Sequence, residues 1–316
     1  MDFTYFYKEK YSNIDKLQNL PEYDIFISMF VNSDRVKAPS CKIKHKNSLW
    51  LTFAEDIHNE FLKGKQLLIL ESNEDFDKMR ERINALGLTG KKVCIDSTGF
   101  RVSYLLVLIR CLYNCNLKQF DVLYTEPIQY RCAEETDFTD NFYEVKQLYG
   151  LSGLNTSNTD NDLLIIAAGY DHSRIIDVAK NKKASKKILL FGFPSLSPDM
   201  FQENVLRAYK AETDIGANCF NDMELNIYSP AYDPFVTAQI IKEYIDKNQK
   251  KEEKEFSNIY LAPLSTKPQA IGMAIFFFWE DGLHKPYSII YPFCQTYYPD
   301  NSEGISNIWR YTIELP

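Results

Sequence analysis

The chain has 316 residues, a net charge of −7 and a pI near 5.3, so it lacks the basic character of proteins that bind DNA without sequence preference. Apolar residues make up 45% of the chain and charged residues 25%, which excludes an intrinsically disordered protein. No apolar run reaches about 18 residues and the N-terminus does not resemble a signal peptide, so no membrane contact is expected.

Seven cysteines are scattered along the chain without the paired spacing of a zinc site. Cys111 and Cys115 lie four residues apart on an expected helix, but no second pair or nearby histidine completes a ligand set. An odd number of cysteines in a chain of this length is typical of a reducing compartment. We therefore expect a cytoplasmic protein with no metal ion and no cofactor.

Short apolar runs, rich in branched and aromatic residues, recur along the whole chain and predict buried strands. They cover residues 23–30, 47–53, 66–72, 91–97, 120–126, 161–169, 186–193, 223–229, 258–264 and 287–293. Their continuous apolar character favours parallel strands that are buried on both faces. A last run, 308–315, alternates between polar and apolar residues and is expected to be an antiparallel edge strand.

Segments with helical periodicity separate these runs. The expected helices cover 74–88, 102–114, 198–212 and 233–249, and the second is apolar almost all round, which predicts burial. This alternation predicts an α/β fold with mostly parallel sheets flanked by helices. Because 148–162 is rich in Gly, Ser, Asn and Thr, we expect a linker there between two Rossmann-like halves, residues 1–150 and 151–316.

Two polar turns at expected strand ends form the candidate ligand site. The first consists of Ser97, Thr98, Gly99 and Arg101, and the second of Ser265, Thr266 and Lys267. Right-handed crossovers bring strand-to-helix turns to one edge of a sheet, where helix N-termini attract anions. Arg101 is expected to be part of the ligand site and not only a surface charge, and its removal should hardly change stability. Helix capping by the hydroxyls is the alternative for either turn.

Other residues at the same expected edge suggest further roles. Tyr130 and Tyr170 could stack on a base or bind a phosphate, although tyrosines in such loops also serve as packing. The candidates for acid–base chemistry are Glu126, Asp96 and His172, each of which also has an ordinary structural explanation. Neither turn matches G-x-x-x-x-G-K-[ST] or G-x-G-x-x-G, which disfavours a P-loop enzyme or a dinucleotide enzyme.

The segment "LAPLSTKPQAIGMAIFFF" resembles the late strand–turn–helix motif of CARF (CRISPR-associated Rossmann fold) domains, and "VCIDSTGFRVSYLLVLI" is similar to the aspartate-Ser/Thr-Gly turn of that group. Leu264 and Ser265 stand where that motif usually has two glycines. The resemblance implies a dimeric sensor of a small nucleotide in antiviral defence, with Ser97, Thr98, Gly99, Ser265, Thr266 and Lys267 in the site. A fainter similarity links "YDIFISMFVNSDRV" to the first strand of TIR domains.

Three functions remain open at the level of the sequence. The first is a sensor that binds a nucleotide or phosphorylated small molecule in one cleft at the strand ends, as a homodimer or with a partner protein. The second is an enzyme that cleaves a nucleotide or glycosidic bond with Glu126, Asp96 or His172. The third is a protein-binding scaffold with a degenerate cleft. An enzyme requires a paired carboxylate or a His–Asp dyad at the cleft, and a sensor does not.

Overall fold

The protein is represented by a computed structural model that describes residues 2–130, 139–216, 226–297 and 302–316. The chain divides into two compact units. Unit 1 comprises Met1–Tyr5 and Asp137–Tyr297, and unit 2 comprises Phe6–Thr136 and Tyr298–Pro316. Each unit is described by itself.

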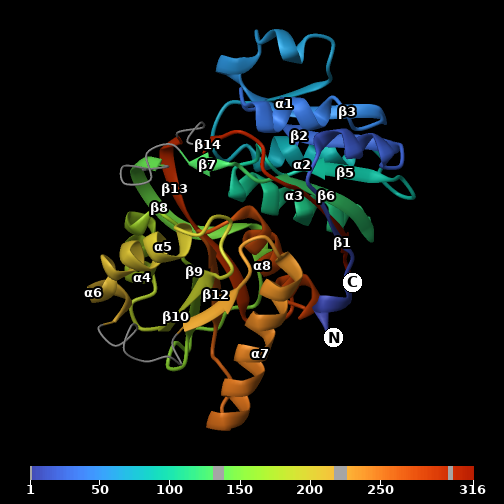
Figure 1. The fold of residues 1–316 in the computed structure, drawn as a ribbon. Coiled ribbons are helices and arrows are strands. Elements are labelled where there is room, and N and C mark those ends of the chain that lie inside the picture. The colour runs from blue at the N-terminus through green and yellow to red at the C-terminus, as the bar shows by residue number, and fades with distance from the viewer. Residues whose placement is uncertain (1, 131–138, 217–225, 298–301) are drawn as a thin grey trace. The chain divides into compact units, whose positions relative to one another are not determined.

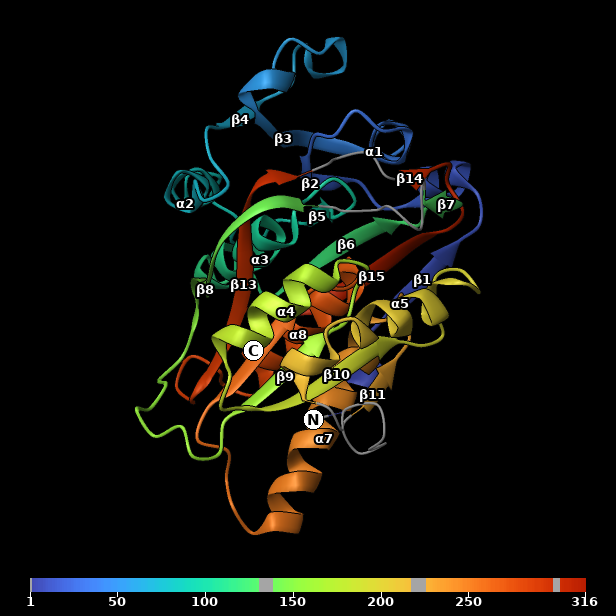
Figure 2. The same ribbon diagram turned by 90° about the vertical axis from the view of Figure 1, so that its left-hand side faces the viewer.

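Unit 2 is built on a seven-stranded sheet. Its strands, in spatial order, are β1 (Lys8–Tyr11), β15 (Ile308–Glu314), β6 (Gln119–Thr125), β5 (Val93–Asp96), β2 (Tyr23–Met29), β3 (His45–Phe53) and β4 (Leu67–Leu70). The five strands from β2 to β6 are parallel, and their spatial order β4-β3-β2-β5-β6 is that of the Rossmann fold. The last strand of the chain, β15, runs antiparallel beside β6 (Figure 2).

Helices connect the parallel strands of unit 2. They are α1 (Asp34–Ser40), α2 (Phe76–Asn84) and α3 (Val102–Asn114), together with the 3-10 helices η2 (Ile14–Asn19), η3 (Ala54–Asp56) and η4 (Glu60–Leu62). A two-stranded ladder joins β7 (Gln129–Tyr130) to β14 (Ser302–Glu303). The expected burial of 102–114 is confirmed, because nine of the thirteen residues of α3 are buried.

Unit 1 repeats the same arrangement with a six-stranded sheet. The spatial order is β11 (Asn226–Ser229), β10 (Lys186–Gly192), β9 (Leu163–Ala167), β12 (Ile259–Pro263), β13 (Tyr287–Tyr297) and β8 (Thr139–Ser152). The first five are parallel and again follow the Rossmann order, while β8 is antiparallel to β13. Its helices are α4 (His172–Asn181), α5 (Met200–Tyr209), α6 (Glu212–Ile215), α7 (Pro234–Glu252) and α8 (Lys267–Trp279), with η1 (Phe3–Tyr5) at the N-terminus.

Right-handed crossovers place the helices on both faces of the unit 1 sheet. In Figure 1, α4, α5 and α6 cover one face, and α7 and α8 cover the other. Apolar side chains from β9, β10 and β12 meet those of α4 in one core cluster that includes Ile166, Ile175 and Val178. The predicted α/β fold, with two Rossmann-like halves and mostly parallel sheets flanked by helices, is confirmed.

Three details differ from the expectations. The strand at the C-terminus is not an edge strand, since β15 lies between β1 and β6. The expected linker at 148–162 begins inside β8, which continues to Ser152, so the whole segment belongs to unit 1. The expected division after residue 150 also differs from the observed units, because the chain passes into unit 1 near residue 137 and returns to unit 2 near residue 298.

Candidate functional site

The sheet of unit 2 has a topological switch point between β2 and β5. From β2 the chain crosses through α1 to β3 on one side, and from β5 it crosses through α3 to β6 on the other. Open α/β sheets bind ligands at such points, beyond the carboxyl ends of the strands. The predicted turn from Ser97 to Arg101 lies at this point, between the end of β5 and the start of α3.

The hydroxyl groups of this turn bond to the neighbouring strand. Ser97 Oγ donates to the carbonyl oxygen of Leu123 at 2.7 Å. The backbone N–H of Thr125 donates to Thr98 Oγ1 at 3.0 Å. The side chains of Ser97 and Thr98 are both buried. These hydroxyls therefore attach the turn to β6, and the expectation that they contact a ligand gains no support from their geometry.

Gly99 allows the turn to approach the end of β2 closely. A Cβ atom at this position would collide with the carbonyl oxygen of Met29 and would lie 3.2 Å from Val36 Cγ2. Since Gly99 is buried, its role is to let two backbones pack at the switch point.

Arg101 ends the turn and occupies the N-cap position of α3. Its guanidinium carbon lies 3.9 Å from the centre of the Phe53 ring, and its Nη1 donates to Asn73 Oδ1. The side chain is half-buried, so Arg101 is not a fully exposed surface charge. This position fixes a positive charge beside the N-terminus of α3, where a helix attracts anions.

The N-terminus of α3 has no side-chain cap. The Arg101 side chain has no acceptor atom and so cannot cap the helix, and the first turn contains no acidic residue. The helices that begin at the corresponding turns of unit 1 differ in this respect, since Thr266 caps α8 and Asp171 caps α4. The backbone N–H groups at the start of α3 are therefore left without a side-chain acceptor from the N-cap residue.

Unit 1 has its own switch point between β9 and β12. Gly169 follows β9 and packs against the turn after β12, where a Cβ atom would collide with the carbonyl oxygen of Leu264. Thr266 Oγ1 donates to the carbonyl oxygen of Ala231 at 2.5 Å and accepts a hydrogen bond from Gln269 N at 3.4 Å. Capping, the alternative reading of the turn, is thus the observed role of Thr266.

The other predicted residues of the second turn are half-buried. Ser265 precedes the cap residue and Lys267 is the first residue of α8. The buried side chain of Gln269 reaches from α8 to Ser229, with Nε2 donating to Ser229 Oγ at 3.0 Å. The turn is consequently packed against the end of β11.

Tyr170 and His172 lie together at the start of α4. The carbonyl oxygen of Tyr170 accepts a hydrogen bond from Arg207 Nη1 at 3.0 Å, and the Arg207 guanidinium carbon lies 5.6 Å from the Tyr170 ring centre. Asp171 Oδ1 accepts from Ser173 Oγ and from Arg174 N, so its carboxylate caps the helix and forms no dyad with His172. Tyr130 is the last residue of β7, and its side chain lies outside the described part of the structure.

The carboxylates at the edge of the unit 2 sheet are engaged in structural hydrogen bonds. Glu126 is buried, with Oε1 accepting from Trp309 Nε1 at 2.6 Å and Oε2 accepting from Asn307 Nδ2 at 2.7 Å. Asp96, also buried, accepts from Thr98 N at 3.0 Å and from Ser28 Oγ at 3.3 Å. These contacts tie both carboxylates into the fold.

The predicted residues fall into two groups on two sheets. Asp96, Ser97, Thr98, Gly99, Arg101, Glu126 and Tyr130 belong to unit 2, and Tyr170, His172, Ser265, Thr266 and Lys267 belong to unit 1. Sequence reasoning missed Phe53 and Asn73, which hold Arg101. Phe53 ends the expected strand 47–53, and Asn73 directly follows the expected strand 66–72. These positions at strand ends were the sequence signal that could have identified the two residues.

No protein-family model matches the chain, and no curated protein matches it. Among solved structures, CobK precorrin-6A reductase is similar over 90% of this chain and 92% of that chain, with a TM-score of 0.23 and 8% sequence identity. A similarity of this strength carries no argument about ligand or activity. Among the described residues, no cluster of His, Cys, Asp and Glu is arranged to hold a metal ion, and no helix is sufficiently long and apolar to cross a bilayer.

Proposed function

We propose that the chain is a ligand-binding protein that holds a nucleotide or a phosphorylated small molecule at the switch point of unit 2. The observation that supports this most strongly is the uncapped N-terminus of α3 next to the positioned guanidinium of Arg101. Oriented N–H groups and a fixed cation together suit a phosphate. The corresponding turns of unit 1 are capped by Thr266 and Asp171, which makes unit 2 the better candidate.

The hydrogen bonds made by the candidate catalytic residues favour a binding role over catalysis. Glu126 and Asp96 are buried and bonded within the fold, and Asp171 caps α4 instead of orienting His172. None of these arrangements supplies the acid–base pair that cleavage of a nucleotide would require. On the resemblance to CARF domains, we further propose a cytoplasmic sensor in antiviral defence that acts as a homodimer or with a partner protein.

The test is to replace Arg101 with alanine and to titrate both proteins with nucleoside mono- and triphosphates and with inorganic phosphate by calorimetry. Arg101→Ala should weaken the binding of every phosphate-containing probe tenfold or more, which corresponds to about 1.4 kcal/mol. Since the guanidinium also stacks on Phe53, the variant should lose about 0.5–2 kcal/mol of stability as well.

Arg80→Ala serves as the matched control. Arg80 lies on α2, pairs with Asp77 at 2.9 Å and is 40% exposed, so its loss removes a surface cation of the same unit. The control should bind the probes like the wild type. Equal affinities for Arg101→Ala and Arg80→Ala would show that the α3 N-terminus is not the phosphate site.

A further inference from the structure

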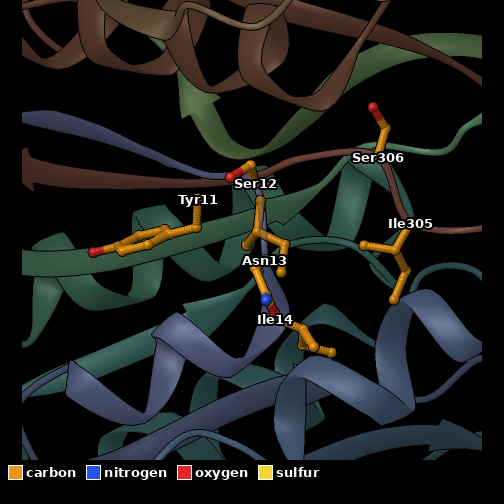
Figure 3. A pocket seen from close by; sticks show the side chains of 7 residues that line it. Tyr11, Ser12, Asn13, Ile14, Ile305 and Ser306 are labelled. Carbon is orange, nitrogen blue, oxygen red and sulfur yellow. The ribbon is translucent and has the colours of Figure 1, made fainter.

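Unit 2 contains a cavity of about 240 Å³ at the same sheet edge as the candidate phosphate site (Figure 3). It lies where β1 ends, where η2 begins and where the chain enters β15. Its lining residues are Tyr11, Ser12, Asn13, Ile14, Ile305, Ser306 and Ile308. Asn13 and Ile14 border it on one side and Ile305 on the other, so segments almost 300 residues apart in the sequence enclose it.

The lining is suited to an uncharged ring with polar groups at its margin. Three isoleucines supply branched apolar surface, which packs well against a flat ring. Asn13 Oδ1 already accepts a hydrogen bond from Asp15 N at 2.8 Å. No described residue bonds to the amide nitrogen of Asn13, which leaves that donor for a ligand.

The charges near the cavity disfavour an anion inside it. Glu126 binds the same segment, since its carbonyl oxygen accepts from Ser306 N and its carboxylate accepts from Asn307 and Trp309. Both carboxylate partners are neutral donors, so the negative charge of this buried group is not cancelled by them. Glu9, bonded to the Tyr11 hydroxyl, lies near the other wall, and its Oε2 is paired with Arg310 Nη1 at 4.0 Å. The carboxylate of Glu126 is therefore the charge that opposes a phosphate here.

The size and position of the cavity indicate that it holds only part of a ligand. Pockets for whole drug-sized ligands measure about 300–1,000 Å³. Along the sheet edge, β15 and β1 lie two and three strands away from β5, which is about 10–14 Å at the usual strand spacing. The cavity and the turn at Ser97–Arg101 can therefore contact opposite ends of one extended molecule.

We propose that this cavity binds the uncharged ring of the ligand, namely the base of a nucleotide whose phosphate lies at the N-terminus of α3. The inference rests on the proposed function for the class of ligand. It assigns the neutral end of that ligand to Ile14, Ile305 and Ile308, and the charged end to the separate site at Arg101.

The experiment compares three kinds of probe by calorimetry: the four ribonucleosides, their 5′-triphosphates and inorganic phosphate. Ile305→Trp fills the cavity from one wall, and Ser306→Phe obstructs it from an exposed position that a folded protein tolerates. Ile69→Trp is the matched control, because Ile69 lies on β4 at the opposite edge of the same sheet and is 37% exposed.

At least one nucleoside should bind without a phosphate, and Ile305→Trp and Ser306→Phe should each weaken its binding tenfold or more. Both variants should leave the affinity for inorganic phosphate unchanged, and Ile69→Trp should bind all probes like the wild type. Arg101→Ala should show the reverse pattern, with nucleoside affinity retained and phosphate affinity lost.

The two proposals fail in different ways. If no nucleoside binds, or if both cavity variants bind nucleotides within twofold of the wild type, the cavity is not the base site, even where Arg101→Ala still weakens phosphate binding. If nucleosides bind and the cavity variants abolish this binding while phosphates add nothing, the cavity is supported and the phosphate site is excluded.

Discussion

The side chain of Asp121, on β6, connects the antiparallel strand β15 to the parallel strands of unit 2. Its Oδ2 accepts from the Tyr23 hydroxyl at 2.5 Å and from Arg310 Nε at 2.9 Å, and its Oδ1 accepts from Thr312 Oγ1 at 2.7 Å. The carboxylate is buried, and Arg310 is 19% exposed. Removal of Asp121 leaves the Arg310 guanidinium with the more distant Glu9, at 4.0 Å, as its remaining carboxylate partner in a poorly hydrated position.

Asp121→Ala should therefore lower the free energy of unfolding by about 3 kcal/mol, as measured by urea denaturation. Asp77→Ala removes an exposed carboxylate that pairs with Arg80 on α2 and should cost much less. Equal losses in the two variants would mean that the Asp121 network contributes no more than a surface ion pair.

The protonation state of Glu9 affects the stability of the edge strand β1. Hydrogen bonds from the hydroxyls of Tyr11 and Tyr7 to Glu9 Oε2 hold the pKa of this carboxyl below its ordinary value. A carboxyl with a lowered folded-state pKa stabilises the fold above its unfolded pKa, and this stability is lost as the pH falls through the folded pKa. The contribution is thus present at neutral pH and absent in acid.

Tyr11→Phe should reduce the free energy of unfolding at neutral pH, and the difference from the wild type should shrink as the pH falls below the pKa of Glu9. Urea denaturation across this pH range measures the difference. A deficit that stays constant with pH would assign the effect to the lost hydroxyl alone and not to the ionisation of Glu9.

The position of the turn hydroxyls could be predicted from the sequence, but their hydrogen-bond partners could not. The sequence predicts correctly that Ser97, Thr98 and Thr266 lie in turns at strand ends. Their partners, however, are the backbone of β6 and the carbonyl oxygen of Ala231, and the sheet order determines these neighbours. A hydroxyl that binds a ligand and one that bonds to an adjacent strand have the same local sequence.

Among the elements, the buried parallel strands and the antiparallel strand β15 were predictable, whereas β1 and β8 were not. Each of the ten expected parallel or central strands is present over the described residues, because continuous branched and aromatic runs occur where both faces are covered. In contrast, β1 reads "KEKY" and is mostly charged, as is common at a sheet edge. The long strand β8 mixes polar and apolar residues, so its sequence resembled a loop.

The two helices on one face of the unit 1 sheet, α7 and α8, pack closely at Gly272. A Cβ atom there would lie 2.7 Å from Thr237 Cβ and would collide with the carbonyl oxygen of Pro234. In an open helix, replacement of glycine by alanine is stabilising by about 0.5–1 kcal/mol. At Gly272 the collision should reverse the sign.

Gly272→Ala should accordingly lower the free energy of unfolding by about 1–3 kcal/mol, the usual cost of overpacking. Chemical denaturation with the wild type in parallel measures this change. A gain of stability would show that the α7–α8 contact relaxes at little cost.

On the scale of the whole molecule, unit 2 depends on both ends of the chain. Residues 1–150 alone lack β15, which bonds to both β1 and β6, and a cut after residue 150 also divides β8. We expect a fragment of residues 1–150 to show no cooperative unfolding transition, whereas co-expressed 1–136 and 298–316 should recover one. Denaturation followed by tryptophan fluorescence distinguishes these outcomes, and a cooperative transition for 1–150 alone would contradict the expectation.

The return of the chain to unit 2 has a consequence for the order of events on the ribosome. The strand β15 follows residues 137–297 of unit 1 in the chain, so β1 must wait for its hydrogen-bonding partner until that part of unit 1 has been translated. Unit 1 is almost entirely translated within this interval and can reach its native state first, although most of unit 2 precedes it. The usual sequence, in which the N-terminal domain matures first during translation, is thereby inverted.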